Sequence, residues 1–263
     1  MTAAEIADQV LRSKKYSTID RGIVERLSTE TITKYSKQKD IIKAVKKELH
    51  IIHESFLQDE CHIKAEAIID SYDGDDLKTD KDISIRLMEL HVSTKERLEQ
   101  AAEVYGFIGR YVKPEDSVID TGCGFNPFAL PFYSGLPKSY LALDIDISTV
   151  KTLNKYFNLS GLPYTAETCD IVLQTPAGNW DILFMFKLFP LLERQKKSRA
   201  FEIIKTMDAG ISIISFPLKS SSGKEKGMEA FYSSQFENEL PLCYFIIEKM
   251  NFINEMFYVI GKR

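Results

Sequence analysis

The segment SVIDTGCGFN, residues 117–126, joins a short apolar run to a turn that contains two glycines. Glycine lets a backbone turn sharply and approach a neighbouring group without a Cβ in the way. A buried strand that enters such a turn and continues into a helix is typical of a βαβ unit, which builds a parallel sheet. This segment therefore predicts an α/β fold for the second half of the chain.

The chain repeats this pattern downstream. Short apolar runs at residues 140–144, 180–186 and 210–216 are separated by stretches of helical character. The last two runs, residues 243–247 and 256–260, flank a short connection and predict an antiparallel hairpin. We therefore predict a Rossmann-like, mainly parallel seven-stranded sheet that ends in an antiparallel hairpin.

The first part of the chain has a different periodicity. Apolar residues recur there at helical spacing, in steps of four, four, three and four: Ile41, Val45, Leu49, Ile52 and Phe56. This spacing keeps them on one helical face, and we find no strand-like alternation of useful length before Ser117. We predict an N-terminal all-helical domain, residues 1–108, followed by the sheet-forming domain, residues 109–263, with the boundary between residues 105 and 115.

Composition narrows the class of protein. The apolar share is 44%, the charged share is 27% and the formal net charge is −4, which does not indicate a general nucleic-acid binder. No apolar stretch reaches the roughly 20 residues that a membrane helix needs, and the N-terminus does not resemble a secretory signal. The four cysteines form no CxxC pair, which argues against a zinc site or a disulfide scaffold. We expect a cytoplasmic, monomeric protein without a metal.

Acidic residues stand at the ends of successive predicted strands. Asp120 opens the loop that contains Gly122 and Gly124, Asp144 ends the next strand, and Asp170 follows a weaker one. This D-x-G-x-G loop differs from both the dinucleotide and the Walker patterns. A carboxylate at 144 can accept hydrogen bonds from both ribose hydroxyls, and one at 170 can accept from an adenine amino group.

Three acidic strand ends suit a nucleoside whose tail is a sulfonium rather than a phosphate. The pattern therefore predicts S-adenosylmethionine as cofactor, and we assign Ile145 and Ile171 to the same site. Asn126, Pro127 and Phe128 follow the first glycine loop, whereas the Asn-Pro-Pro-Phe motif of amino-methylating enzymes follows the fourth strand. We interpret Asn126 as a helix cap and Pro127 as a first-turn residue. Cys123 lies inside the loop and is a poor candidate for a nucleophile.

Four motifs occur in order: HVSTKERL at residues 91–98, SVIDTGCGFNP at 117–127, FKLFP at 186–190, and SFPLKSSSGKEKGME at 215–229. Together they resemble the aminoglycoside-resistance methyltransferases of 16S ribosomal RNA, the Arm/Rmt type. The likeness extends from about residue 43 to the C-terminus. It departs from the family's usual pattern at Ser222, where leucine is expected, and at Lys224, where arginine is frequent.

The resemblance implies a class I methyltransferase that modifies N7 of one guanine in the decoding A site of the assembled 30S subunit. It thereby implies resistance to 4,6-disubstituted deoxystreptamine aminoglycosides. It assigns Arg97 to the methionine carboxylate of the cofactor, as a guanidinium can bind a carboxylate in bidentate fashion. The alternative is that Ser93 or Thr94 caps a helix and Arg97 lies on its surface.

Guanine N7 carries a lone pair and no proton, so its methylation requires no general base. Catalysis then depends on in-line positioning and on the exclusion of water. We expect Lys187 and Pro190, after the fourth strand, and Lys219 and Met228, after the fifth, to position the target, since both segments lie at the carboxyl edge of the sheet. The four histidines are expected to be surface or structural residues.

Basic residues are predicted to contact the ribosomal RNA. Near a flipped guanine these are Arg194, Lys224 and Lys226. In the helical domain they are Lys37, Lys43, Lys46 and Lys47, because a local basic face can attract phosphates even on an acidic protein. The alternative for each set is a solvated helix face. Two other functions stay open: methylation of a different target, such as the A-site adenine N1 or a small molecule, and ribosome binding without catalysis.

Overall fold

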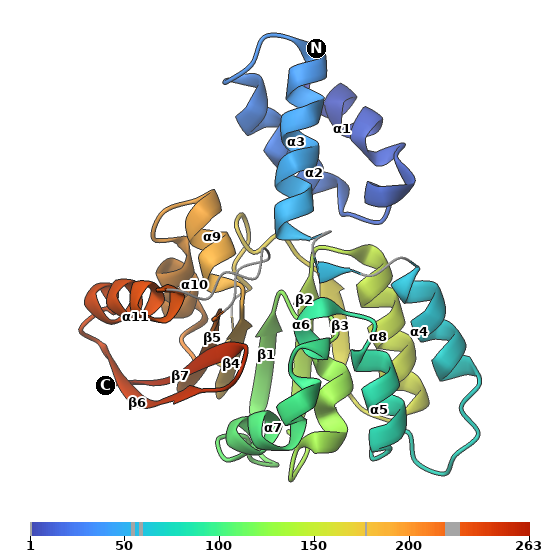
Figure 1. Cartoon of the computed structure of the whole chain (residues 1–263), viewed down its shortest axis with the longest axis vertical. Helices are drawn as coiled ribbons and strands as arrows, with labels where there is room; N and C mark the ends of the chain where they lie inside the picture. The colour runs from blue at the N-terminus through green and yellow to red at the C-terminus, as the bar shows by residue number, and fades with distance from the viewer. Residues whose placement is uncertain (1, 54–55, 58–59, 177, 219–226) are drawn as a thin grey trace.

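Seven strands form one sheet in the order β3-β2-β1-β4-β5-β7-β6. The computed structural model describes residues 2–53, 56–57, 60–176, 178–218 and 227–263 (Figure 1). The strand bounds are β1 Ser117–Thr121, β2 Ser139–Asp144, β3 Thr165–Thr168, β4 Ile182–Phe186, β5 Ile211–Pro217, β6 Tyr244–Asn251 and β7 Glu255–Lys262. Strands β1 to β5 pair in parallel, whereas β7 is antiparallel to both β5 and β6. The predicted mainly parallel sheet with a closing antiparallel hairpin is confirmed.

Helices cover both faces of the sheet, so its central strands are buried on either side. All five residues of β4 are buried, as expected for a strand of a doubly covered parallel sheet. One core cluster joins the sheet to α4 (Cys61–Asp70), α5 (Lys81–Met88), α7 (Ala101–Gly109) and α8 (Ile147–Leu159). The other joins it to α9 (Phe189–Gln195), α10 (Arg199–Met207) and α11 (Met228–Glu239). The helix α6 (Val92–Lys95) is a single turn.

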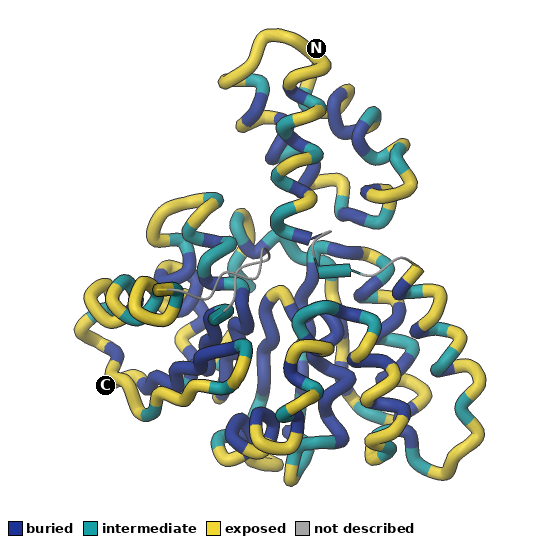
Figure 2. Tube along the Cα trace, in the orientation of Figure 1, coloured by how far each residue is buried: buried dark blue, intermediate teal, exposed yellow. Residues whose placement is uncertain are grey.

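The first three helices form a small bundle with a core of its own. These are α1 (Ala3–Leu11), α2 (Arg21–Ile32) and α3 (Gln38–Ile52), and they stand apart from the sheet at the top of Figure 1. Their core contains Ile6, Ile23 and Val45, and Figure 2 shows this buried seam inside an exposed surface. Helices α4, α5 and α7 instead share their core with the sheet. The division of the chain at residue 108 stays a prediction.

The segment after the glycine loop is a 3-10 helix, Asn126–Phe132, rather than an α-helix. Pro127 stands in its first turn and Pro131 lies inside it, where a proline has no N–H to donate. Pro127 is therefore placed as predicted. Asn126 is not a cap: the residue at the cap position is Phe125, and it makes no side-chain capping bond. In the part of the chain that the structure describes, no helix has both the length and the apolar character needed to span a bilayer.

Phe236→Ala should lower the free energy of unfolding by about 3–5 kcal/mol. The Phe236 ring is fully buried and packs against Phe189, Phe216 and Tyr258, so its loss leaves a cavity. Urea denaturation followed by circular dichroism measures the change. Phe231→Ala, on the same helix, is the control, because that side chain is 63% exposed and its loss should cost under about 1 kcal/mol. Equal losses would contradict this packing of α11.

Candidate active site

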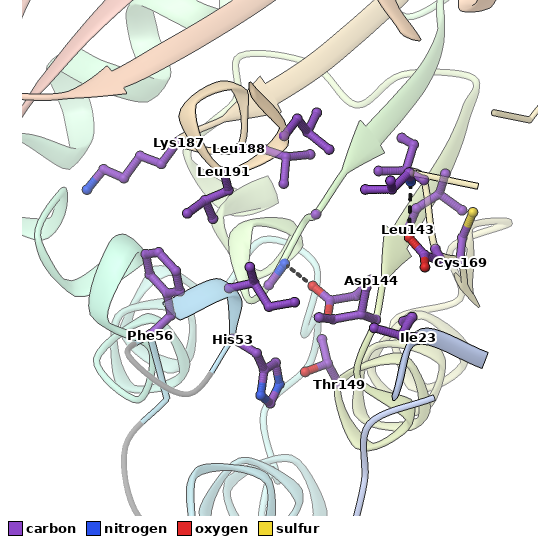
Figure 3. Close-up of a pocket in the computed structure, with 18 of the residues that line it drawn as sticks. Ile23, His53, Phe56, Leu143, Asp144, Thr149, Cys169, Lys187, Leu188 and Leu191 are labelled. Atoms are coloured by element: carbon purple, nitrogen blue, oxygen red, sulfur yellow. Dashed lines mark hydrogen bonds between the residues drawn. The ribbon is translucent and has the colours of Figure 1, made fainter. Parts of the chain in front are cut away.

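One cavity lies at the carboxyl edge of the sheet, beside the ends of β1, β2 and β4 (Figure 3). The predicted cofactor residues that line it are Gly122, Gly124, Asp144, Ile145, Asp170 and Ile171. Lys187 lines the same cavity. The remaining wall comes partly from the helical bundle and the segment that follows it, through Ile23, Arg26, Ile52, His53, Phe56 and Leu57. The bundle's share of the wall was not predicted from the sequence.

The glycine loop after β1 has a backbone that only glycine adopts readily. Gly122 has φ +59° and Gly124 has φ +49°, in the left-handed region that disfavours other residues. A Cβ at Gly122 would lie 3.0 Å from a methyl carbon of Leu188, and one at Gly124 would lie 2.8 Å from Nε2 of His91. A side chain at either position would therefore press against a neighbouring side chain, so the loop requires glycine at both.

Asp144 is buried at the end of β2 and braces this loop. Its Oδ2 accepts from the backbone N–H of Gly124 at 2.8 Å, and its Oδ1 accepts from the N–H of Asp146 at 3.0 Å. Burial raises the pKa of the Asp144 carboxyl, against the effect of nearby His53 and of these two bonds. Each carboxylate oxygen has a further lone pair for a ligand. The geometry thus fits the predicted acceptor for ribose hydroxyls.

Asp120 lies beneath the loop and does not line the cavity. Its Oδ2 accepts from the hydroxyl of Tyr140 at 2.6 Å and from Nδ2 of Asn126 at 2.8 Å. Burial raises the pKa of Asp120 to about 6, although both hydrogen bonds oppose the shift. Asp120 thus supports the loop from below, and its predicted contact with the cofactor stays a prediction.

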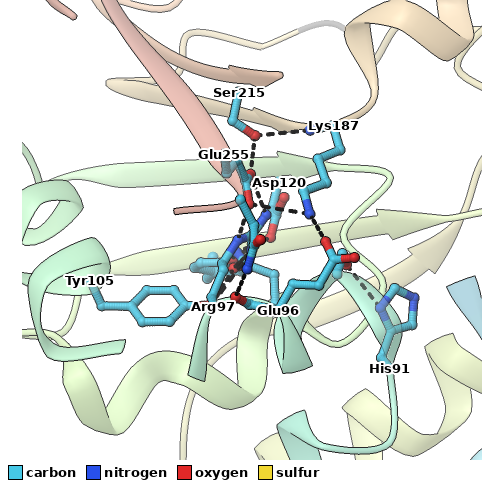
Figure 4. Close-up of polar contacts among 12 residues, drawn as sticks. His91, Glu96, Arg97, Tyr105, Asp120, Lys187, Ser215 and Glu255 are labelled. Carbon is cyan, nitrogen blue, oxygen red and sulfur yellow. Dashed lines mark hydrogen bonds and ion pairs between the residues drawn. The ribbon is translucent and has the colours of Figure 1, made fainter. Parts of the chain in front are cut away.

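Arg97 is enclosed in a buried polar network (Figure 4). Its Nε and Nη2 donate to the two carboxylate oxygens of Glu255, each at 2.8 Å, and its Nη1 donates to Asn126 at 3.0 Å. Burial acts to raise the pKa of Glu255, but Arg97 and Lys187 outweigh it, so that pKa is lowered. Arg97 does not line the cavity. Arg97 is buried and pairs with Glu255, so the alternative that it lies on a helix surface is wrong.

Lys187 follows β4 in the left-handed backbone region, with φ +56°. Its ammonium contacts Glu96, and it lies 3.5 Å from an oxygen of Glu255. The side chain is 5% exposed. Its charge is therefore paired within the protein, and its predicted role in positioning the target stays a prediction. The sequence analysis did not predict that Glu96 and Glu255 pair with Lys187. The available signal for Glu255 was its position as an acidic residue directly before the apolar run 256–260.

Comparison with known proteins decides the class of enzyme. The ribosomal RNA methyltransferase family FmrO matches residues 12–259. The chain belongs to this family. A 16S rRNA (guanine(1405)-N(7))-methyltransferase of Proteus mirabilis is 30% identical over 98% of this chain and 96% of its own length. One of Serratia marcescens is 30% identical over 100% of this chain and 99% of its own.

Solved structures of the same class superpose over the whole chain. The 16S rRNA methyltransferase RmtF, in complex with S-adenosyl-L-homocysteine, has a TM-score of 0.90 at 28% identity and covers 99% of this chain and 98% of its own. The 16S rRNA methylase RmtB has a TM-score of 0.85 at 26% identity, with coverage of 100% and 99%. The predicted family and fold are both confirmed.

S-adenosylmethionine is the methyl donor of this methyltransferase, and the cavity fits it. The two positive-φ glycines line the cavity, so the loop backbone itself forms part of the wall. The cations Arg26 and Lys187, which line the wall, are paired with carboxylates, as suits a ligand without phosphate. Among the described residues, no group of three or more metal-ligating side chains is found.

The other predicted contact residues are spread over the carboxyl edge and the bundle. Pro190 is half-buried in the first turn of α9, and Met228 begins α11. Arg194 is exposed but pairs with Glu48 of α3 at 3.1 Å, so its charge is shared with the bundle. Lys219, Lys224 and Lys226 lie outside the described residues, as does Ser222. On or beside α3, Lys37, Lys43 and Lys47 are exposed and Lys46 is half-buried.

Glu255→Gln should lower the free energy of unfolding by about 3–5 kcal/mol, because it leaves buried Arg97 and Lys187 short of a counter-charge. Urea unfolding of both proteins measures the difference. Glu248→Gln is the matched control, since Glu248 pairs with the exposed Arg110 at the surface. That change should cost under about 1 kcal/mol. A cost for Glu255→Gln as small as that of the control would contradict the buried network.

His91 makes stability depend on pH. Burial lowers the pKa of His91 from 6.5 to about 3, and nearby cationic groups add to the shift. Between these values the unfolded chain binds a proton that the folded chain does not, so this histidine's contribution to stability is lost as the pH falls below about 6.5. Between these two pKa values the free energy of unfolding falls by about 1.4 kcal/mol for each unit by which the pH is lowered.

His91→Gln should flatten this dependence relative to the parent between pH 6 and pH 4, even if it lowers stability at pH 7. Urea unfolding at several pH values measures the two slopes. Since the other titrating groups are common to both proteins, the difference isolates one proton. Parallel slopes would contradict a buried neutral His91.

Proposed function

We propose that this methyltransferase transfers the methyl group of S-adenosylmethionine to N7 of guanine 1405 of 16S rRNA, the specificity named for its relatives. We propose further that it acts in the cytoplasm on the A site of the assembled 30S subunit and so confers resistance to 4,6-disubstituted deoxystreptamine aminoglycosides. The observation that carries the proposal is a donor cavity whose ionisable side chains are unsuited to general-base or nucleophilic catalysis.

Each candidate base or nucleophile on the cavity wall is engaged or inactive. The pKa of His91 is lowered to about 3, so its imidazole is a poor base at neutral pH. Burial raises the pKa of Cys169 to about 11, which keeps it a thiol. Asp144 holds the glycine loop. Lys187 is paired with Glu96, Asp170 with Arg26 and His53 with Asp146. N7 of guanine needs no base, because its lone pair attacks the methyl carbon directly while the donor's sulfur leaves with the bond's electrons.

We assign the cofactor contacts by element. The carboxylate of Asp144 accepts the ribose hydroxyls, that of Asp170 accepts the adenine amino group, and Ile145 and Ile171 pack beside the nucleoside. The family resemblance assigns the methionine carboxylate to Arg97, although this buried residue does not itself line the cavity. Because Glu255, Asn126 and Tyr105 already occupy four of the five N–H donors of this guanidinium, the cofactor must share it with Glu255.

The remaining contribution to catalysis is positioning. Phe186 and Leu188, around the end of β4, line the cavity, where they exclude water from the methyl group. A guanine flipped out of its RNA stack can enter such a site. With the donor held by the strand ends, in-line approach of N7 supplies the rate increase through proximity and orientation.

The helical bundle carries the proposed RNA-docking surface, which consists of Lys37, Lys43, Lys46 and Lys47. Among the described residues, none of the four forms an ion pair with a carboxylate, and three of them are exposed. Helix α3 ends at the cavity, where Ile52 and its C-cap His53 form part of the wall. An RNA whose phosphates bind along this helix would therefore have a neighbouring segment close to the methyl donor.

Methylation in vitro tests the proposed target. We expect the protein to methylate 30S subunits and not naked 16S rRNA, with strand cleavage at guanine 1405 after borohydride and aniline treatment. A reverse-transcription stop at an A-site adenine without cleavage would indicate the adenine N1 alternative. Absence of methyl transfer from both substrates would overturn the proposal.

Lys46→Ala combined with Lys47→Ala should weaken 30S binding without changing affinity for S-adenosylhomocysteine. The loss of two phosphate contacts should reduce the slope of log K against log salt by roughly two. Filter binding at several salt concentrations measures this slope, and calorimetry measures cofactor affinity. Lys113→Ala with Lys138→Ala is the control, because both residues are exposed and precede β1 and β2, at the opposite edge of the sheet. A control that loses as much affinity would argue against the assigned surface.

A further inference from the structure

Arg26, on α2 of the bundle, reaches the wall of the cofactor cavity. Its Nε donates to Oδ2 of Asp170 at 2.6 Å, and its Nη2 lies 3.4 Å from Oδ1 of the same carboxylate. Nη2 also donates to Gln195, at the end of α9, at 2.9 Å, and Nη1 donates to Glu30 at 3.1 Å. The side chains of Arg26 and Asp170 are only 8% and 10% exposed. This is a nearly buried ion pair between segments 144 residues apart.

The start of α2 is fixed against the loop that follows β2. The backbone N–H of Asp20, the N-cap of α2, donates to Ile145 at 3.0 Å, and that of Ile147 donates to Thr18 at 2.8 Å. The hydroxyl of Thr18 donates to the buried Asp146 at 2.7 Å. These bonds tie the bundle to a loop that itself lines the cavity. Arg26, little more than one turn into α2, is therefore held in register with the cofactor site.

The pair decides what Asp170 can accept. Oδ1 of Asp170 accepts a hydrogen bond from the N–H of Val172 at 3.1 Å, and Oδ2 accepts from Arg26. Protein donors therefore fix the orientation of both carboxylate oxygens. Arg26 supplies the counter-charge that a nearly buried carboxylate requires. A carboxylate held in such an ion pair only accepts hydrogen bonds. It therefore favours an amino group on the purine and repels a carbonyl oxygen at the same position.

We propose that Arg26 is a positioning residue that holds Asp170 as a fixed acceptor for the adenine amino group, so that the helical bundle sets the base specificity of the cofactor site. The inference rests on the proposed assignment of Asp170 to that amino group. It makes the bundle a part of the cofactor site as well as a docking surface.

Calorimetric titration of the full chain tests the proposal with two ligands, S-adenosylhomocysteine and its deaminated analogue S-inosylhomocysteine. The ratio of their dissociation constants measures the preference for the amino group. We expect Arg26→Ala to reduce this ratio by about tenfold or more, as for loss of a hydrogen bond to a charged group. Arg26→Lys keeps the positive charge but loses the bidentate geometry of the guanidinium, so it should reduce the ratio less.

Arg21→Ala is the matched control. Arg21 lies on the same helix and is half-exposed, and its ion pairs with Asp8 and Glu25 stay within the bundle. It should leave the ratio unchanged. A merely structural role for Arg26 would weaken both ligands equally and keep the ratio, which would overturn the proposal. Thermal unfolding of each variant confirms that folded proteins are compared.

Asp170→Ala separates this inference from the assignment on which it rests. If Arg26 acts through Asp170, Asp170→Ala lowers the ratio, and Arg26→Ala added to it has no further effect on the ratio. An unchanged ratio in Asp170→Ala would overturn the adenine assignment, and with it the role of Arg26. If Asp170→Ala lowers the ratio and Arg26→Ala leaves it unchanged, only the role of Arg26 is overturned. Methylation of 30S subunits by the parent protein tests the target independently.

Discussion

The buried charges of Glu255, Arg97 and Lys187 join three parts of the chain that are distant in sequence. Glu255 opens β7 and pairs in register with Pro217, the last residue of β5. Since β7 runs antiparallel, its first residue lies at the edge where the parallel strands end, beside the residue that follows β4. Buried charges are stable only when they are paired. The reversed direction of one strand therefore places the counter-charge that Arg97 and Lys187 require, and these in turn lie next to the donor cavity.

The cavity is built jointly by strand ends and by the helical bundle. Asp146, the N-cap of α8, is fully buried and accepts from the N–H of Thr149 at 2.8 Å. It is also reached by the hydroxyl of Thr18 and, at 3.0 Å, by Nε2 of His53. One carboxylate thus links the bundle to the residues that follow Asp144. The bundle that carries the proposed docking surface and the loops that line the cavity therefore share one buried anchor.

Local pattern was sufficient for much of the site. The glycine loop, the acidic residue that ends β2 and the one that follows β3 were found because parallel strands end at one edge of the sheet. Their order along the chain therefore predicts that they lie near one another in space. The residues missed were those whose role depends on a partner far along the chain. Arg26 resembles an ordinary helix-surface arginine in sequence, and Asn126 resembles a cap. Only packing shows that the first reaches Asp170 and that the second bridges Asp120 and Arg97.

The sequence by itself determined the sheet and its closing hairpin, because periodicity is a local property. Four motifs in order were sufficient to indicate the methyltransferase family, and the acidic strand ends indicated the edge of the sheet at which the cavity lies. The tertiary structure decided which charges are available there. It paired Lys187 with Glu96 and Glu255, moved Asp120 beneath the glycine loop, and brought α2 to the cavity wall. Burial and long-range pairing set the protonation and orientation of each group, and neither is encoded in the neighbouring residues. The glycine loop therefore predicts where the cofactor binds, whereas the packing around it decides which side chains can contact the cofactor.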